Sequence, residues 1–203
     1  IKHKGLDGSS FELTINNIRL TINLPLPGLY NIYNAVAALA IAHYLNLPTH
    51  KSFKDFQPAF GRFEKLPFGY IFLIKNPAGA SQVFETIAPN LKKNDRLLVA
   101  LNDNLADGAD VSWIWDAQFE RLAQFGGQII CSGTRAYDLA NRLKYAGFDP
   151  KTIKVEPNLK QALKEARGGL VGRLFILPTY TAMLELQSVL AKSGIKKHYW
   201  EEE

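Results

Sequence analysis

The sequence predicts an α/β protein in which a mostly parallel sheet is flanked by helices. From Tyr70 onward, short apolar runs alternate with segments of helical length and pattern, which is typical of βαβ units. Those runs are apolar at nearly every position and are bounded by polar residues, as in parallel strands that are buried on both faces. The two patterns predict a Rossmann-like domain over residues 59–203, preceded by a smaller portion over residues 1–58.

The smaller portion is expected to contain two strands joined by an Asn-Asn turn, followed by an Ala-rich helix. In chain order these elements cover residues 10–15, 16–17, 19–24 and 30–44. We expect a second short helix after them that turns Phe53 and Phe56 inward, and then a linker over residues 58–62.

The larger portion is expected to contain five strands with helices between them and one helix after the last strand. The predicted strands cover residues 70–74, 97–101, 128–131, 153–155 and 173–177. The predicted helices cover residues 80–91, 113–124, 134–146, 158–166 and 181–192. The third of these helices shows the clearest apolar stripe, which Gly147 ends.

Composition narrows the class of protein. With 47% hydrophobic residues, the 203-residue chain is expected to be globular, and no apolar run approaches the length of a membrane span. The net charge of +5 is spread along the chain, which argues against a nucleic-acid partner, and we expect a cytoplasmic protein. Cys131 is the single cysteine, so a disulfide within the chain is excluded and core packing is expected of it. None of the four histidines has metal-ligand spacing with another.

The most informative segment is residues 107–120, where a predicted strand gives way to a predicted helix. It holds Asp107, Asp110 and Asp116 beside Trp113 and Trp115. With Trp115 on the inward stripe of the helix, Asp116 is turned about 100° away from the core. The acids can be read as turn residues and as partners of the helix dipole, or as a recognition site flanked by aromatic surface.

Two other polar pairs are candidates for nucleotide binding. Lys75 and Asn76 follow the first strand of the larger portion, where they can meet a phosphate or a carboxylate, or form an ordinary turn. Asn31 and Asn34 lie one helical turn apart, and their amides match the edge of adenine or cap a helix. No Walker-type phosphate loop and no dinucleotide fingerprint occur in the chain.

Taken together, these segments resemble the Mur ligase family. The run Gly28-x-x-Asn31-x-x-Asn34-Ala35 is similar to the adenine-side motif at the end of that family's ATPase domain, so residues 1–58 look like a fragment of the central domain. Within the family, the closer similarity is to synthetase subunits that work with a separate glutaminase. It rests on three segments, residues 75–79, 102–116 and 177–183.

The resemblance implies an ATP-dependent ligase that amidates the α-carboxylate of the D-glutamate in the lipid II stem peptide, at the inner face of the membrane. It implies a glutaminase partner (GatD type) that contributes a Cys-His pair, which Asp116 completes in trans. It also implies ATP and Mg²⁺ in the full-length protein, with zinc held in a part of the central domain that the sequence lacks. Asp107, Asp110 and Trp113 are expected to shape the loop or to contact the partner, with a contact from either acid to ribose left open.

The chain departs from the family by lacking the phosphate loop, the Mg²⁺-binding part and the cysteine-rich zinc ribbon. We therefore expect it to be the C-terminal part of a longer synthetase and to be inactive by itself. Two alternatives stay open. One is a non-catalytic module that docks a glutaminase or a nucleotide, and the other is the C-terminal domain of an ordinary Mur-type amino-acid ligase.

Overall fold

A computed structural model describes the chain except for residues 48–52, 54–55, 57–60 and 197–203. It divides into two compact units, Ile1–Pro58 with Glu85–Asn90, and Ala59–Phe84 with Leu91–Glu203. The predicted short helix before residue 58 and the linker over residues 58–62 fall largely outside the described residues. Phe56 is described, and it is 41% exposed instead of turned inward.

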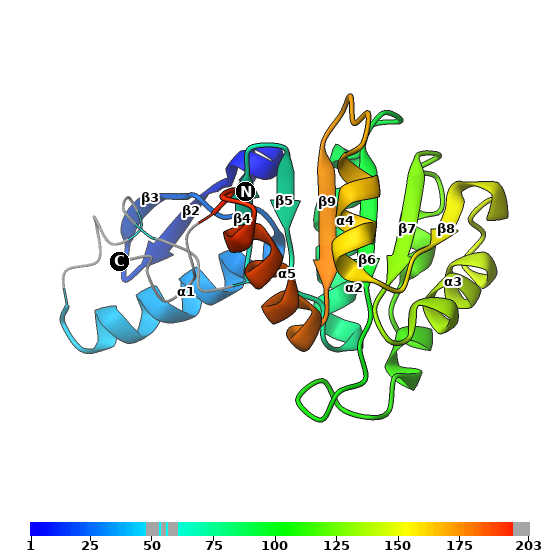
Figure 1. The fold of residues 1–203 in the computed structure, drawn as a ribbon. Coiled ribbons are helices and arrows are strands. Elements are labelled where there is room, and N and C mark those ends of the chain that lie inside the picture. Colours follow the sequence, from blue (N-terminus) through cyan, green and yellow to red (C-terminus); the bar gives the residue numbers. More distant parts are fainter. Residues whose placement is uncertain (48–52, 54–55, 57–60, 197–203) are drawn as a thin grey trace. The chain divides into compact units, whose positions relative to one another are not determined.

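The first unit is built on a three-stranded antiparallel sheet in the order β1-β2-β3 (Figure 1). Its elements are β1 (Lys2–His3), the 3₁₀ turn η1 (Gly5–Asp7), β2 (Ser9–Ile15), β3 (Ile18–Leu24) and α1 (Leu29–Tyr44). Asn16 and Asn17 both have positive φ, 46° and 64°, as a tight two-residue hairpin turn requires. The predicted turn, both long strands and the Ala-rich helix are therefore confirmed.

The second unit contains a six-stranded sheet in the order β4-β5-β9-β6-β7-β8. The strands are β4 (Glu64–Leu66), β5 (Gly69–Ile71), β6 (Arg96–Ala100), β7 (Gln128–Ser132), β8 (Ile153–Val155) and β9 (Leu174–Pro178). Every neighbouring pair is parallel except β4 and β5. This arrangement confirms the predicted mostly parallel sheet, and the five predicted strands lie close to their expected bounds. The edge strand β4 was not predicted.

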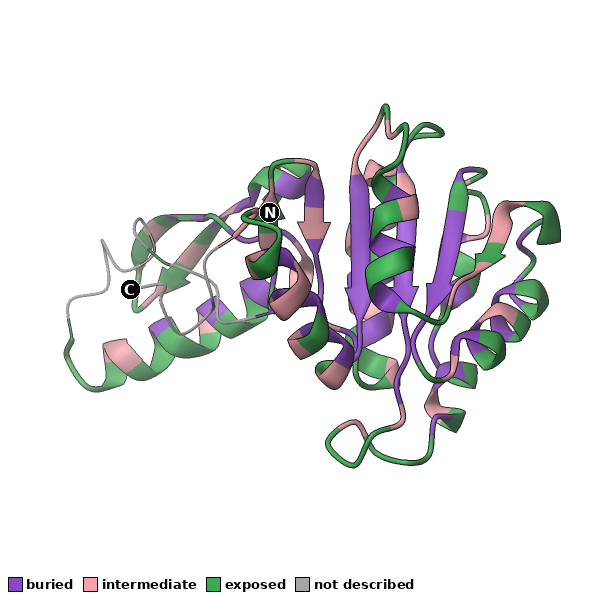
Figure 2. Ribbon diagram, viewed as in Figure 1, coloured by how far each residue is buried: buried purple, intermediate pink, exposed green. Residues whose placement is uncertain are grey.

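The helices of the second unit pack on this sheet. They are α2 (Pro77–Ile87), whose residues from Glu85 onward belong to the first unit, α3 (Ala136–Tyr145), α4 (Leu159–Arg167) and α5 (Tyr180–Lys192), with the 3₁₀ turn η5 (Pro150–Thr152). The 3₁₀ turn η2 (Ala88–Asn90) belongs to the first unit. On one face, apolar side chains of α4 and α5 form a continuous core with Leu98, Ile130 and Ile176 of the central strands. Figure 2 shows these central strands buried along their length, while the outer sides of the helices are exposed. The last three predicted helices are confirmed to within two residues at each end.

One predicted helix is absent. Instead of a helix over residues 113–124, the structure has two 3₁₀ turns, η3 (Ser112–Trp115) and η4 (Phe119–Leu122). Between them Gln118 has φ −80° and ψ 60°, and Phe119 N–H donates to the carbonyl of Ala117 at 2.9 Å, which is an inverse γ-turn. Ile114, Ala117, Phe119 and Leu122 face the core, whereas Trp115 is 50% exposed. The predicted inward stripe was therefore wrong at Trp115.

Candidate functional site

The candidate site lies at the carboxyl edge of the parallel sheet, where β5, β9, β6 and β7 end. The loop between β6 and η3 projects from this edge and carries two of the predicted acids, Asp107 and Asp110, and the third, Asp116, follows η3 (Figure 1). Ligands of parallel α/β sheets commonly bind at this edge, because successive strands deliver their loops to the same place. Lys75 and Asn76 reach the same edge from the end of β5.

Three strand ends are joined at this edge by Asn102, which follows β6 and is 5% exposed. Its backbone N–H donates to Thr179 Oγ1 at 3.0 Å, and its side-chain amide donates to Thr181 Oγ1 at 3.0 Å. Its side-chain carbonyl accepts from the N–H of Thr134, also at 3.0 Å. Gly133 lies so close that a Cβ there would be 2.5 Å from Asn102 Oδ1. Asn102 therefore ties the ends of β6, β7 and β9 together.

Asp107 anchors the loop to the first turn of α5. Its carboxylate accepts from the N–H of Thr181 at 2.9 Å and from Thr181 Oγ1 at 2.5 Å. The Thr181 hydroxyl also accepts from the amides of Asn102 and Asn104, at 3.0 and 2.8 Å. A carboxylate at a helix N-terminus also interacts favourably with the helix dipole. Asp107 thus shapes the loop, and sequence reasoning missed its partner because Thr181 lies 74 residues away.

We expect Thr181→Val to lower the free energy of unfolding by about 1–2 kcal/mol. The substitution keeps the side-chain shape but removes a hydroxyl that donates one hydrogen bond and accepts two, leaving the Asn102 and Asn104 amides short of an acceptor. Urea unfolding monitored by tryptophan fluorescence measures this loss. Thr181→Ser is the matched control, and it should recover most of the stability. Equal losses in both variants would contradict the assigned hydroxyl network.

A second polar cluster flanks the loop at the start of α3. Asp103 accepts from Thr134 Oγ1 at 2.8 Å and from Arg135 Nη1 at 3.1 Å, and Arg135 also binds Asp138 at 2.6 Å. The hydrogen bonds from Thr134 and Arg135 hold the pKa of the partly exposed Asp103 carboxyl below its usual value. This carboxylate is therefore already paired within the unit.

Asp110 has a local structural role at the start of η3. Its Oδ1 accepts from the backbone N–H of Ser112 at 2.8 Å, and this bond lowers the pKa of Asp110. Val111 precedes η3 as its capping residue and makes no side-chain hydrogen bond there.

Asp116 directly follows η3 and is exposed. Its backbone N–H donates to the carbonyl of Trp113 at 3.1 Å, which fixes its main chain. Among the residues that the structure describes, no hydrogen bond or ion pair involves its carboxylate. Asp116 thus differs from Asp103, Asp107 and Asp110, whose carboxylates are all occupied within the unit.

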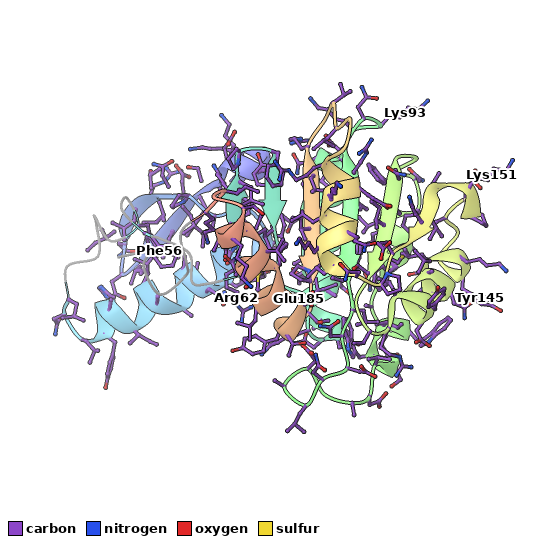
Figure 3. The ribbon with its side chains drawn as sticks, viewed as in Figure 1. Phe56, Arg62, Lys93, Tyr145, Lys151 and Glu185 are labelled. Carbon is purple, nitrogen blue, oxygen red and sulfur yellow. The ribbon has the colours of Figure 1, made fainter. Side chains whose placement is uncertain are left out.

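An exposed aromatic pair lies beside Asp116. The ring of Trp115 meets Tyr145 of α3 at a centroid distance of 5.7 Å, nearly edge to face, and the two residues are 50% and 71% exposed. Figure 3 shows Tyr145 on the outer side of α3. Trp113 is only partly exposed, and its carbonyl accepts from the N–H groups of Asp116 and Ala117. Trp115, and less so Trp113, offers aromatic surface to solvent.

Lys75 and Asn76 form the turn between β5 and α2. Asn76 Oδ1 accepts from the N–H of Gly79 at 2.7 Å, and Pro77 is the first residue of α2, so Asn76 caps that helix. Asn76 and Lys75 are both exposed, and in the described part of the chain Lys75 forms no ion pair. The turn offers cationic and amide donors beside a helix N-terminus.

Asn31 and Asn34 lie in the first turns of α1, in the other unit. Asn31 is 8% exposed, and its amide donates to the carbonyl of Pro27 at 2.7 Å. Asn34 is exposed. Their environments therefore differ: the amide of Asn31 holds the entry to its own helix, whereas that of Asn34 faces outward.

Cys131 lies within β7 and is fully buried. Burial raises the pKa of its thiol to about 12, so the thiolate that a nucleophile requires is not formed at neutral pH. The predicted role in core packing is confirmed.

Neither a metal centre nor a membrane span is found in the described residues. There, no three His, Cys, Asp or Glu side chains are grouped so that they could hold a metal ion. No helix within those residues is both long and apolar enough to cross a bilayer.

Comparison with known proteins identifies the family. The family model described as MurT ligase C-terminal matches residues 73–183, which include β6, the acidic loop and the start of α5. The chain belongs to the MurT family. It is 40% identical over 199 residues to the MurT subunit of lipid II isoglutaminyl synthase (glutamine-hydrolyzing) of Streptococcus pneumoniae R6, covering 91% of this chain and 44% of that protein. The corresponding subunit of Staphylococcus aureus COL is 32% identical over 179 residues, covering 84% of this chain and 40% of that protein.

Solved structures show the same fold at low identity. Mycobacterium tuberculosis folylpolyglutamate synthase, complexed with ADP and AMPPCP, matches with a TM-score of 0.67 and 19% identity, over 97% of this chain and 47% of that one. MurF of Acinetobacter baumannii matches with a TM-score of 0.61 and 17% identity, over 92% and 42% of the two chains. The chain thus has the fold of Mur-type ligases, and it spans less than half the length of the MurT relatives that it matches.

Proposed function

We propose that this chain is part of the synthetase subunit of a glutamine-dependent lipid II isoglutaminyl synthase. In this proposal the enzyme uses ATP and ammonia to amidate the D-glutamate α-carboxylate of the peptidoglycan stem peptide, on the cytoplasmic side of the membrane. Its support is the family membership and the names of the two MurT relatives. The glutaminase that releases the ammonia is a separate subunit with a Cys-His pair.

Asp116 supplies the missing third member of that catalytic set. The observation that carries this assignment is its carboxylate, which is exposed at the carboxyl edge of the sheet while the loop acids around it are paired. A carboxylate that accepts a hydrogen bond from the partner's imidazole fixes its tautomer and stabilises the imidazolium. The partner's cysteine is then held as the thiolate that attacks the glutamine amide.

The aromatic pair Trp115 and Tyr145 gives the partner a surface beside Asp116. Large exposed rings contribute strongly at protein interfaces because they bury much area with few rotatable bonds. In this proposal Trp115 is the main contact with the glutaminase. Trp113 and Asp110 act on the shape of the loop, and Asp107 anchors it.

Nucleotide binding is proposed for residues of each unit taken by itself, Lys75 and Asn76 in the second unit and Asn31 and Asn34 in the first. The exposed Lys75 and the amide donors of the exposed Asn76 fit an anionic phosphate, and the amide of the exposed Asn34 fits an adenine edge. Asn31 fits less well, because its amide is already donated to Pro27. When bound, ATP with Mg²⁺ would supply the energy that activates the carboxylate. Within the described residues, no three His, Cys, Asp or Glu side chains are grouped so that they could hold Mg²⁺ or zinc.

The test separates ammonia release from ligation. The full-length synthetase carrying Asp116→Asn is reconstituted with its glutaminase, and lipid II amidation is measured with glutamine and then with ammonium chloride. The proposal expects loss of the glutamine-driven reaction while the ammonia-driven reaction persists. Equal glutamine-driven rates in the variant and the parent would reject the role of Asp116. Failure of the parent complex to amidate lipid II would reject the function.

A further inference from the structure

Arg142 of α3 is a buried arginine whose hydrogen bonds bracket Asp116. The residue is 3% exposed. Its Nε donates to the carbonyl of Ile114 at 2.9 Å, and its Nη2 donates to the carbonyl of Ala117 at 2.9 Å. Ile114 lies two residues before Asp116, and Ala117 directly follows it. One guanidinium therefore fixes the main chain on both sides of the exposed carboxylate.

The same guanidinium also holds side chains of this segment. Nη2 donates to Glu120 Oε1 at 2.8 Å, and the guanidinium carbon lies 5.5 Å and 5.4 Å from the ring centroids of Trp115 and Phe119. Cation–π contacts of this kind are favourable and orient the rings. Arg142 is therefore the centre of the short segment that presents both Asp116 and the aromatic surface.

Local structure alone is too weak to hold this segment. η3 and η4 are four residues each, and 3₁₀ turns of that length have few internal hydrogen bonds. In an α-helix the carbonyl of Ile114 would accept from the N–H of Gln118, but that N–H donates to Ser81 Oγ at 3.1 Å. Arg142 donates a hydrogen bond to the carbonyl of Ile114 instead. The backbone course at Asp116 is thus set by contacts from α2 and α3.

We infer that Arg142 is a positioning residue, which holds Asp116 where the partner's histidine meets it. This inference rests on the proposed function. A guanidinium suits the task, because its planar fork binds two carbonyls in fixed directions and stays charged at every working pH. Catalytic groups need to be placed to within about 0.5 Å, and a misplacement of about 1 Å can lower a rate by about 100-fold.

The experiment compares Arg142→Gln with the parent in the full-length synthetase–glutaminase complex, at saturating subunit concentration. We expect kcat for glutamine hydrolysis to fall by roughly 10–100-fold. The KM for glutamine should stay within about twofold, because glutamine binds in the partner, and ammonia-driven amidation should persist. A parent-like ratio of glutamine-driven to ammonia-driven rates would overturn the inference.

A second variant and a matched control distinguish loss of positioning from loss of folding. Arg142→Lys keeps the charge but loses the fork, so we expect a smaller fall in kcat, and an unchanged kcat there overturns the inference even if Arg142→Gln does not fold. Arg96→Gln is the control, because Arg96 also donates to backbone carbonyls, those of Glu165, Ala166 and Gly168, but at the opposite edge of the sheet. It should leave the ratio of the two rates unchanged, and a changed ratio would overturn the inference.

A double variant separates this inference from the proposed function. If Arg142 acts through Asp116, adding Arg142→Gln to Asp116→Asn should lower glutaminase kcat by less than about twofold more, instead of multiplying the two losses. Multiplied losses overturn the inference and leave the role of Asp116 in place. If Asp116→Asn leaves glutaminase kcat unchanged while Arg142→Gln lowers it, both the proposed role of Asp116 and this inference are overturned.

Discussion

Replacing Asp116 with asparagine is expected to lower the glutaminase activity of the reconstituted complex by about 10²–10⁴-fold, the range typical of losing the acid of a catalytic triad. Asparagine keeps the size of the side chain, and the backbone bond to Trp113 is unaffected. The amide is neutral and can present a donor where the imidazole needs an acceptor. We therefore expect the loss of activity to appear as a fall in kcat for glutamine hydrolysis, which is measured as glutamate release.

The same variant should keep its fold, because no hydrogen bond or ion pair of the carboxylate is found within the described residues. Its unfolding free energy should stay within about 0.5 kcal/mol of the parent. Asp149→Asn is a matched control: this exposed acid caps η5 by accepting from the N–H of Lys151 at 2.9 Å, and asparagine caps helices equally well. A glutaminase loss of the same size in the control would contradict a specific role for Asp116.

Replacing Asp95 with alanine is expected to cost on the order of 3 kcal/mol of unfolding free energy. Asp95 is 2% exposed and joins the starts of β6 and β9. Its carboxylate accepts from the N–H groups of Lys92 and Arg173, at 2.9 and 2.8 Å, and from Arg173 Nη2 at 2.8 Å. Alanine leaves two partly buried backbone donors and a cation without their acceptor. Chemical denaturation at pH 7 measures the loss.

The effect of Asp95 depends on pH with a definite sign. Burial by itself raises the pKa of this carboxyl, but the hydrogen bonds from Arg173 and Lys92 outweigh it and hold the pKa below its usual value. The stabilisation is therefore fully present above the unfolded pKa of about 3.9 and is lost as the pH falls through the lower folded pKa. The difference between Asp95→Ala and the parent should thus shrink below about pH 4.

Glu12→Ala is the contrasting control for Asp95. Glu12 pairs with Arg19 on the other unit, and their side chains are 56% and 70% exposed. An exposed pair is typically worth less than about 1 kcal/mol, so this variant should differ little from the parent at any pH. Similar losses for the two substitutions would show that the buried hydrogen bonds of Asp95 contribute nothing specific.

The sheet could be predicted because buried strands and buried helix faces appear in the sequence as local patterns of apolar residues. The strands β6, β7 and β9 are apolar at nearly every position, and the helices α3 and α4 carry stripes at helical spacing. The short edge strand β4 shows no such apolar pattern, because only three of its residues pair and they are partly exposed. The 113–124 segment misled the prediction because Trp115, Phe119 and Leu122 imitate a helical stripe.

The site was predictable in its residue types but only in part in its geometry. The acids and tryptophans of residues 107–116 stand out in the sequence, and the family resemblance singles out Asp116 among them. The roles of Asp107 and Asp110 as loop anchors were expected only in outline. Their partners, and the outward position of Trp115, became visible only in the structure.

The sequence by itself determined the α/β class, the order of strands and helices along the chain, and the family to which the chain belongs. Tertiary structure decided which carboxylates are occupied and which one is left exposed. The physical reason is that Thr181 and Arg142 reach the loop from 74 and 25–28 residues away. Hydrogen bonds at such separations leave no periodic pattern in the sequence, yet they outweigh local helix propensity and fix the backbone around Asp116.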